Sequence, residues 1–549
     1  MKQPGSTLKE RLCAWLPAAV LYLLCGTGPW ASGSEPALDI IPNPSHLVAY
    51  EDSFPINAQT AVVANVQARN EAAFLARRLR DATGLPLPLL TGSADGGSNR
   101  ILLRLEVPEA PGSGTDRESY RLSATGERIL IAAPHPAGLF YGVQTLLQML
   151  PPEIYAPAAA DPPLGPLSIP RVEITDRPRF AWRGLMVDVS RHFFSKEQLK
   201  KTVDAMAMHK LNVLHLHLTD DPGWRIEIER YPRLVHVGAI GDYSNPHGPA
   251  RLYFSKDDMR EIVAYAAHRH IRVVPEIDMP GHAAAAARAY PEFFDGHKTF
   301  NPGIDATYEF VANLLAEIME LFPSPYIHFG GDEVRDHRWD ELPEVHALME
   351  QHGYRTLREV EGHFDRFVAD YILSRARIPI GWDEIVEFDL DPETVVQWWL
   401  HLRPEALERA VERGHRVIIS PTNYLYFDYP NEAGEPGAPW EGNDNGPNSF
   451  QLIHGWEPVP ESFTPEQEAL VLGLQANLWT EFITTNEYFE YMIFPRLSAL
   501  AEIAWSPRGE KDLDDFTRRL RTQTRRYAAM GLNYREFGEW PVDFRYLSH

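Results

Sequence analysis

Short apolar runs alternate with helix-like segments from Phe180 onward, and this alternation constrains the fold more strongly than any other feature of the sequence. The eight runs that we expect to be strands are "GLMVDV", "NVLHLHL", "RVVPEI", "YIHFG", "IPIGW", "TVVQW", "RVIIS" and "LGLQAN". Strand and helix alternating eight times over roughly 330 residues are typical of a parallel (β/α)8 barrel. The sequence therefore predicts an α/β protein with a (β/α)8 TIM barrel over residues 176–508.

Helix start signals between the runs support this periodicity. Ser195 with Gln198, and Ser255 with Asp258, each resemble a capping box ahead of apolar residues at helical spacing. We therefore expect a helix to begin after each serine.

The chain before the barrel has a different pattern. Apolar residues at helical spacing occur in "NEAAFLARRLRDATG" and "AGLFYGVQTLLQML", and "RILIAAP" between them is typical of a strand. We expect a small α+β domain over residues 34–175, with the proline-rich "PPEIYAPAAADPPLGPLSIP" as a linker or an extended crossing segment. Residues 509–549 are expected to form a helical extension packed on the barrel.

Residues 1–33 are typical of an export signal peptide. A basic start precedes the apolar "LCAWLPAAVLYLLCG", and the small residues "ASG" suit cleavage; an uncleaved signal anchor is the alternative. Both cysteines, Cys13 and Cys25, lie in this segment, so the mature chain would have neither a disulfide nor a cysteine metal site. We expect export, to a periplasm or out of the cell.

The formal net charge of -24 argues against two classes of partner. Nucleic acid and anionic lipid surfaces are both bound by basic faces. We therefore expect no nucleic-acid partner and no membrane association once the signal is removed. The oligomeric state stays open.

Polar and aromatic residues follow all eight apolar runs. Because the carboxyl ends of barrel strands meet at one mouth, these side chains should surround a single pocket. They are Ser190, Arg191, His192, Thr219, Asp220, Asp221, Asp278, His282, Asp332, Glu333, Trp382, Asp383, Glu384, Trp398, Trp399, Tyr426, Asp428, Trp479 and Glu481. The adjacent acids Asp332 and Glu333 in "YIHFGGDEV" are either well solvated or arranged so that one keeps its proton.

Three functions fit such a mouth. A glycoside hydrolase needs a carboxylic acid to protonate the leaving oxygen, and Trp rings suit the faces of pyranose sugars. A metal-dependent amidohydrolase would begin with His215 and His217 on one strand face, completed by His328 and Asp332. That site would need more histidines at later strand ends than the sequence offers. A sugar-binding barrel without catalysis is the third interpretation.

Several longer motifs are specific enough to compare with a known family. They are "RFAWRGLMVDVSRHFFS", "LNVLHLHLTDDPGWRIEIERYP", "VVPEIDMPGHAAAA", "IHFGGDEV", "LGLQANLWTE" and the segment that continues to "ALAEIAW". In this order they resemble the β-N-acetylhexosaminidases of glycoside hydrolase family 20, and the N-terminal unit is similar to the small domain that precedes the barrel there. The resemblance covers nearly all of the mature chain.

The resemblance implies an exo-acting, retaining enzyme without a protein nucleophile. It would release terminal GlcNAc, and also GalNAc, from N-acetylhexosamine-containing oligosaccharides or glycoconjugates, with no cofactor and no metal. The 2-acetamido oxygen of the sugar would attack its own anomeric carbon to give an oxazolinium ion. Glu333 would act as general acid and then base, while Asp332 would hold the acetamide. A lacto-N-biosidase-like enzyme, which releases a disaccharide, is the alternative within the family.

The other residues carried over by the resemblance would bind the sugar or support the groups that do. They are Arg191, Asp428 and Glu481 for the hydroxyls, Trp382, Trp399 and Trp479 around the N-acetyl group, Tyr426 for its oxygen, Asp221 and His282 as a relay behind Glu333, and Asp278 behind the site. We expect an ionised Asp332 to raise the pKa of Glu333, so that the acid starts protonated. The loop Pro430–Phe450 has no obvious counterpart in the family.

Overall fold

The computed structural model describes residues 38–536, apart from 93–96, 107–114, 158–161, 166, 336, 440–445 and 510. The predicted export signal over residues 1–33 lies outside this part. No helix among the described residues is long and apolar enough to cross a membrane.

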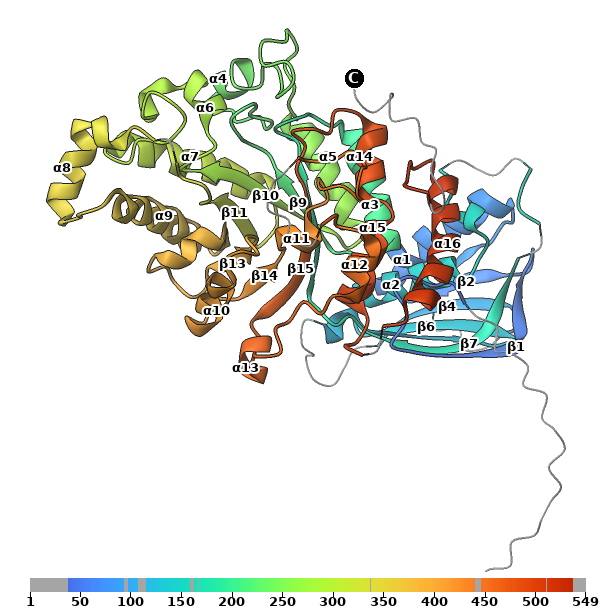
Figure 1. Ribbon diagram of the computed structural model, residues 1–549. Helices are drawn as coiled ribbons and strands as arrows, with labels where there is room; N and C mark the ends of the chain where they lie inside the picture. Colours follow the sequence, from blue (N-terminus) through green and yellow to red (C-terminus); the bar gives the residue numbers. More distant parts are fainter. Residues whose placement is uncertain are drawn as a thin grey trace, which may run out of the picture.

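Eight parallel strands close into a barrel in sequence order, and the TIM-barrel prediction is confirmed (Figure 1). Each predicted run coincides with one strand. The strands are β8 (Trp182–Asp188), β9 (Val213–His217), β10 (Arg272–Met279), β11 (Tyr326–Gly330), β12 (Ile378–Trp382), β13 (Val395–Trp398), β14 (Val417–Ile419) and β15 (Val471–Leu478).

Helices connect and cover these strands, with one exception to strict alternation. They are α3 (Lys196–Met208), α4 (Arg233–His236), α5 (Lys256–Ala267), α6 (Ala284–Ala289), α7 (Asp305–Leu321), α8 (Pro343–His352), α9 (Leu357–Ser374), α10 (Pro404–Glu412), α11 (Thr422–Leu425), α12 (Phe450–Gly455), α13 (Pro465–Glu468), α14 (Asn486–Ile493) and α15 (Arg496–Trp505). After β12 the chain forms the 3-10 helix η6 (Asp383–Glu387) instead of an α-helix.

The predicted capping signals have different outcomes. Ser255 and Asp258 form a complete capping box at the start of α5. Ser195 accepts the backbone N–H of Gln198 at the start of α3, as expected. The Gln198 side chain, however, donates to Glu490 on α14 at 3.0 Å, so this box is only half formed.

The N-terminal domain is a seven-stranded mixed sheet with two helices between it and the barrel (Figure 1). In sheet order the strands are β1 (His46–Ile56), β7 (Leu167–Asp176), β5 (Tyr120–Ala124), β6 (Arg128–Ala133), β4 (Arg100–Leu105), β2 (Ala61–Ala64) and β3 (Leu89–Thr91), and the helices are α1 (Arg69–Thr83) and α2 (Pro136–Gln148). Helix α2 is buried between the two domains: its Gln148 side chain donates to the Met208 carbonyl of the barrel at 3.0 Å.

The proline-rich segment is only partly a linker. Its last residues, "LSIP", open β7, which pairs with β1 on one side and with β5 on the other. Pro170 is tolerated there because β5 pairs with β7 only from Val172 onward, so its missing N–H faces no partner on that side. The prediction gave more weight to the proline content of this segment than to the strand pattern of its last residues.

The described part of the C-terminal extension is the helix α16 (Leu513–Ala529). It contacts the barrel, where Arg519 pairs with Glu502 of α15 at 2.6 Å. It also contacts the N-terminal domain, where Arg526 donates to the Gln148 carbonyl at 2.6 Å. The extension therefore ties the two domains together, in addition to packing on the barrel as predicted.

The barrel interior changes from apolar to polar toward the carboxyl ends of the strands. An apolar cluster fills the other end: Trp182, Val213, Val274, Ile380, Val395 and Ile418. Two residues further along the strands, inward positions are held by His215, Glu276, Gln397 and Gln475, all fully or almost fully buried. Side chains two apart share a face, so the next inward positions open onto the mouth.

Candidate active site

The chain turns sharply after β11, and this turn presents Asp332 and Glu333 to one pocket. Gly330 and Gly331 have φ of 78° and 88°, and a Cβ on Gly330 would lie 1.8 Å from Asp278 Oδ1. Glu333 itself has φ of 47°, a conformation that is strained for a residue other than glycine. The two glycines in "FGGDE" are therefore required by the backbone that displays the acids.

One pocket at the mouth brings together nine of the eleven predicted site residues. It is lined by Arg191, Asp332, Glu333, Trp382, Trp399, Thr422, Tyr426, Asp428, Tyr429, Trp479 and Glu481. Asp221 and His282 are not among the lining residues, and Thr422 and Tyr429 were not predicted.

Aromatic rings form the walls of this pocket. Trp479 lies 5.7 Å from Trp382 and 6.3 Å from Tyr426, and Tyr426 stacks on Trp399 at 6.1 Å. Trp399 lines the pocket, whereas Trp398 points outward and donates its indole N–H to the Arg403 carbonyl. The alternation of side chains along β13 explains this choice.

Trp382 and Trp399 are each held by a buried carboxylate. The Trp382 indole donates to Glu276 Oε1 at 2.8 Å, and the Trp399 indole donates to Glu384 Oε2 at 3.0 Å. Burial raises the pKa of Glu384 above its usual value. Both rings are thereby fixed in orientation before any ligand enters.

Arg191 lies among three acids at one end of the pocket. Its guanidinium is 2.7 Å from Asp220, 3.4 Å from Asp188 and 3.7 Å from Glu481, and it stacks over the Trp479 ring at 4.7 Å. Asp188 and Asp220 hold the fork in place, since both are fully buried. The exposed edge of the guanidinium and Glu481 remain available to polar groups of a ligand.

Behind Glu333, His282 is paired with Asp220, whereas the prediction placed Asp221 there. His282 Nδ1 lies 3.3 Å from Asp220 Oδ1, and its Nε2 lies 3.7 Å from Glu333 Oε2. Asp221 instead accepts the backbone N–H of Ala284 and stabilises that loop. Both carboxylates lie near the His282 ring, but only Asp220 is paired with it.

The pKa shifts of Asp332 and Glu333 are also the reverse of the prediction, which expected the raised pKa on Glu333. The approach of the His282 ring is the main cause that lowers the pKa of Glu333, with Arg335 and Arg191 adding to it. Burial raises the pKa of Asp332 to about 8, and neighbouring carboxylates contribute. Glu333 is 40% exposed and Asp332 only 11%, so solvent and nearby cations favour charge on Glu333.

Other acids near the pair share the environment of Asp332. Burial and Asp332 raise the pKa of Asp278 well above its usual range, and neither Asp278 oxygen has a hydrogen-bond partner among the described residues. Burial together with Glu384 raises the pKa of Asp383 to about 8. The mouth therefore contains several carboxyl groups whose negative charge is poorly compensated.

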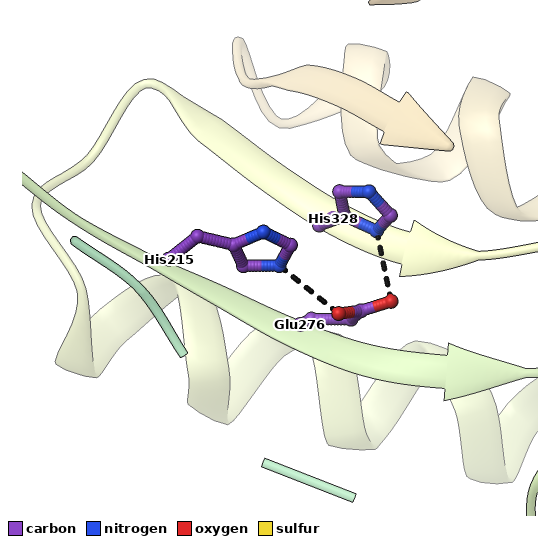
Figure 2. Close-up of side chains that lie close together, drawn as sticks. All are labelled: His215, Glu276 and His328. Carbon is purple, nitrogen blue, oxygen red and sulfur yellow. Dashed lines mark ion pairs between the residues drawn. The ribbon is translucent and has the colours of Figure 1, made fainter. Parts of the chain in front are cut away.

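The metal-site interpretation grouped three histidines with Asp332, whereas in the structure the three histidines lie together around Glu276 and apart from Asp332. His215 and His328 face Glu276, with nitrogen–oxygen distances of 3.0 and 3.2 Å (Figure 2). His217 also faces Glu276, at 2.6 Å. The groups close to Asp332 are His282 and Asp278, so the predicted donor set is not assembled.

Sequence reasoning missed Glu276 and Glu384 as supports of the pocket walls. Glu276 lies two residues before Asp278 on β10, and the period of a strand places both side chains inward. That signal was available in the sequence. For Thr422 and Tyr429 no local pattern distinguishes a pocket position, because they lie in a long connection between β14 and β15.

Comparison with known families now adds to this geometry. Residues 180–508 match the model "Glycosyl hydrolase family 20, catalytic domain", and residues 37–177 match "Glycosyl hydrolase family 20, domain 2". Together the two matches cover both domains.

Individual relatives agree with the family match. A "Beta-hexosaminidase" of Porphyromonas gingivalis is 35% identical over 520 residues, which are 91% of this chain but 64% of that protein. The chain thus spans somewhat less than two thirds of that relative. A "Beta-N-acetylhexosaminidase" of Cellulomonas fimi is 32% identical over 505 residues, covering 88% of this chain and 93% of the other.

A solved structure gives the same result. The exo β-N-acetylglucosaminidase of Vibrio harveyi, in complex with N-acetylglucosamine, has a TM-score of 0.79 at 31% identity and covers 91% of this chain and 78% of that one. The family models, the relatives and the fold all lead to one conclusion. The chain belongs to glycosyl hydrolase family 20.

Proposed function

We propose that the protein is an exo-acting, retaining β-N-acetylhexosaminidase that releases terminal GlcNAc, and also GalNAc, from oligosaccharides or glycoconjugates. The observation that carries this proposal is the adjacent pair Asp332 and Glu333 on one pocket walled by three tryptophans. The relatives named β-hexosaminidase and the N-acetylglucosamine complex of the Vibrio harveyi enzyme support it.

The pocket suits a single terminal sugar. Trp rings offer large apolar faces for a pyranose ring and for an acetamide methyl group. Arg191, Asp428 and Glu481 offer charged groups for the hydroxyls, where directional hydrogen bonds are strong. Below the pocket the barrel is filled by Glu276 and its histidines, so a longer chain has no path beyond its non-reducing end. This geometry favours exo-acting cleavage.

The reaction itself needs no nucleophile from the protein. The acetamide oxygen attacks the anomeric carbon of its own ring, while Glu333 gives a proton to the leaving oxygen. Water, deprotonated by Glu333, then opens the oxazolinium ion with retention. Asp332 accepts the acetamide N–H and opposes the positive charge that develops. Holding the attacking group within the substrate is a large effective-molarity gain, on the order of 7–11 kcal/mol in favourable cases.

The proton distribution in the free protein means that substrate binding must move a proton. The raised pKa of Asp332 and the lowered pKa of Glu333 favour a proton on Asp332 and a charge on Glu333 before binding. A bound sugar covers Glu333 and raises its pKa, while the acetamide N–H lowers that of Asp332. His282 Nε2 lies 3.7 Å from an oxygen of each acid, in a position to pass the proton from Asp332 to Glu333.

Hydrolysis of a panel of 4-nitrophenyl glycosides tests the proposed function. We expect release of 4-nitrophenol from β-GlcNAc and β-GalNAc glycosides, each as a monosaccharide product. Faster release from a lacto-N-biose glycoside, with the disaccharide as product, would favour the lacto-N-biosidase alternative. Binding of GlcNAc without turnover of any glycoside would favour a non-catalytic barrel.

A further inference from the structure

A second polar cluster lies beneath the pocket, where the proposed reaction makes no direct use of it. It consists of Glu276 on β10, His215 and His217 on β9, and His328 on β11, each at most 1% exposed. Figure 2 shows His215 and His328 approaching the Glu276 carboxylate from the two neighbouring strands. Burying a polar group lowers the stability of a protein unless the group has a hydrogen-bond or ion-pair partner. The partner of each ring nitrogen therefore shows which protonation state the histidine has.

The hydrogen-bond partners of His215 define it as a neutral ring. The indole N–H of Trp182 can only donate, and it lies 3.1 Å from Gln475 Oε1. The Gln475 amide nitrogen therefore faces His215 Nδ1 at 3.0 Å and donates to it. His215 Nε2 is left to carry the proton and lies 3.0 Å from Glu276 Oε2, and burial lowers the pKa of His215 to about 4.

His328 is also engaged locally. His328 Nδ1 lies 3.2 Å from Glu276 Oε1 and 3.1 Å from the backbone nitrogen of Gly330. His328 makes no further hydrogen bond toward the mouth among the described residues. Like His215, His328 contacts Glu276 but no acid of the pocket.

His217 differs from both, because each of its ring nitrogens faces a carboxylate. Nδ1 lies 2.6 Å from Glu276 Oε2, and Nε2 lies 2.9 Å from Asp220 Oδ2. Carboxylates only accept, so both nitrogens donate and the ring is an imidazolium. Although burial opposes the charge, Glu276 and Asp220 raise the pKa of His217 well above its usual value.

Through His217 the buried cluster is connected to the acids of the pocket. Asp220 is 3.3 Å from His282, and His282 is 3.7 Å from Glu333. The other charged groups that act on His217 or Asp220 include Arg191, Asp278, Asp221 and Glu481. The Trp479 ring packs edge-on against His217 at 4.9 Å. His217 itself does not line the pocket.

We propose that His217 is a positioning residue of the reaction, joined by one ring nitrogen to Glu276 and by the other to Asp220. It fixes Asp220, and through Asp220 it fixes the His282 ring against Glu333. This inference rests on the proposed function, because it assigns a role in the proton transfer of that reaction. His215 is the matched counterpart: it is two residues away on the same strand, equally buried and bonded to the same Glu276, but has no link to Asp220.

The experiment compares His217→Gln with His215→Gln by steady-state kinetics on 4-nitrophenyl β-GlcNAc and on a GlcNAc glycoside with a poor leaving group. Glutamine cannot donate to both carboxylates and carries no charge. We expect His217→Gln to lower kcat on the order of 10- to 100-fold for the poor leaving group, because the acid is misplaced. We expect His215→Gln to stay within about threefold of wild type.

The pH dependence of kcat gives a readout that a purely structural role would not change. Loss of the His217 cation frees Asp220 and His282, so the pKa of Glu333 loses the influence that now lowers it. The limb of the profile that belongs to Glu333 should move to higher pH by about 0.5 unit or more in His217→Gln but not in His215→Gln. Glu276→Gln, which keeps the side-chain volume but removes the anion that charges His217, should move it in the same direction.

The outcomes separate the two proposals. The position of a pH limb and KM do not depend on the folded fraction, so partial unfolding of a variant leaves them interpretable. Equal behaviour of His217→Gln and His215→Gln, whether both shift or neither does, would overturn the positioning role. A wild-type protein that releases no 4-nitrophenol from any N-acetylhexosaminide would instead overturn the proposed function.

Discussion

Two groups of buried acids occupy the same barrel, and their surroundings are opposite. Glu276 in the interior accepts a hydrogen bond from the Trp382 indole and faces three histidines, which hold its pKa well below the usual value despite complete burial. Asp278, two residues further along β10, has a raised pKa, and its carboxylate oxygens have no hydrogen-bond partner among the described residues. The pKa of Asp332 is raised as well, to about 8. Glu276 is therefore paired within the protein, whereas Asp278 and Asp332 are left to be paired by a ligand.

The mouth, and not the interior, is also where the backbone is strained. Strained backbone at His282 and Glu333, with φ of 48° and 47°, occurs at the mouth, next to the poorly compensated carboxyls. Such sites lower the stability of a protein while preparing it for its reaction. The following substitutions test whether the two groups really differ in this way.

The largest effect is expected from Glu333→Gln at the mouth. Loss of the proton donor should lower kcat roughly 100- to 10,000-fold for a substrate with a poor leaving group, and much less for a 4-nitrophenyl glycoside. The measurement is kcat on both substrates. Glu341→Gln, an exposed glutamate in the connection between β11 and β12, is the control and should leave kcat unchanged. Equal rates for Glu333→Gln and wild type would remove Glu333 from its role.

A second comparison concerns stability, and the two groups should respond with opposite signs. Glu276→Gln breaks the buried ion pair with His217, whether or not the ring then gives up its proton, so the free energy of unfolding should fall by about 3–5 kcal/mol. Asp332→Asn removes a carboxyl that the pocket disfavours, so the free energy of unfolding should rise by about 1–3 kcal/mol near neutral pH. Denaturant unfolding of both variants measures this. Destabilisation of similar size in both would show that the mouth and the interior are not different.

The effect of Asp332→Asn should also depend on pH in a defined direction. The pKa of Asp332 is about 8 in the folded protein and about 4 in an unfolded chain. Between these values the unfolded state has lost the proton that the folded state keeps, so this group's contribution to stability is present below about pH 4 and lost by about pH 8. Asparagine does not titrate. The gain in melting temperature over wild type should therefore be larger near about pH 8 than near about pH 5, by roughly 1 °C per kcal/mol. A constant gain would contradict the raised pKa.

The smallest effect is expected at Trp399, whose indole donates to Glu384 at the mouth. Trp399→Phe loses the bond to Glu384 but keeps a ring against Tyr426, so KM for GlcNAc glycosides should rise about three- to tenfold with little change in kcat. Trp382→Phe, which breaks the bond to the ionised Glu276, should cost about 1–3 kcal/mol of stability as well. Equal losses of stability in the two variants would argue against the distinction between the groups.

The sequence predicted the barrel because its signal is repeated eight times and each copy is local. It predicted the positions of Asp332, Glu333 and the three tryptophans, because strand ends converge in this fold and the family motifs locate them. It did not predict which of Asp220 and Asp221 faces His282, since that depends on how the chain turns after β9. The pKa order of Asp332 and Glu333 was also wrong, because it depends on His282, Arg335 and Glu384, which come from other connections of the barrel.

One measurement tests most directly whether a sugar's own acetamide completes this site. The kcat/KM of wild type is compared on 4-nitrophenyl β-GlcNAc and on the β-glucoside that lacks the N-acetyl group, with Asp332→Asn measured in parallel. We expect the N-acetylated substrate to be preferred at least about 1,000-fold by wild type, and by a smaller factor in the variant. If the glucoside were cleaved within about tenfold of its N-acetylated analogue, Asp332 and Glu333 would not act through the acetamide.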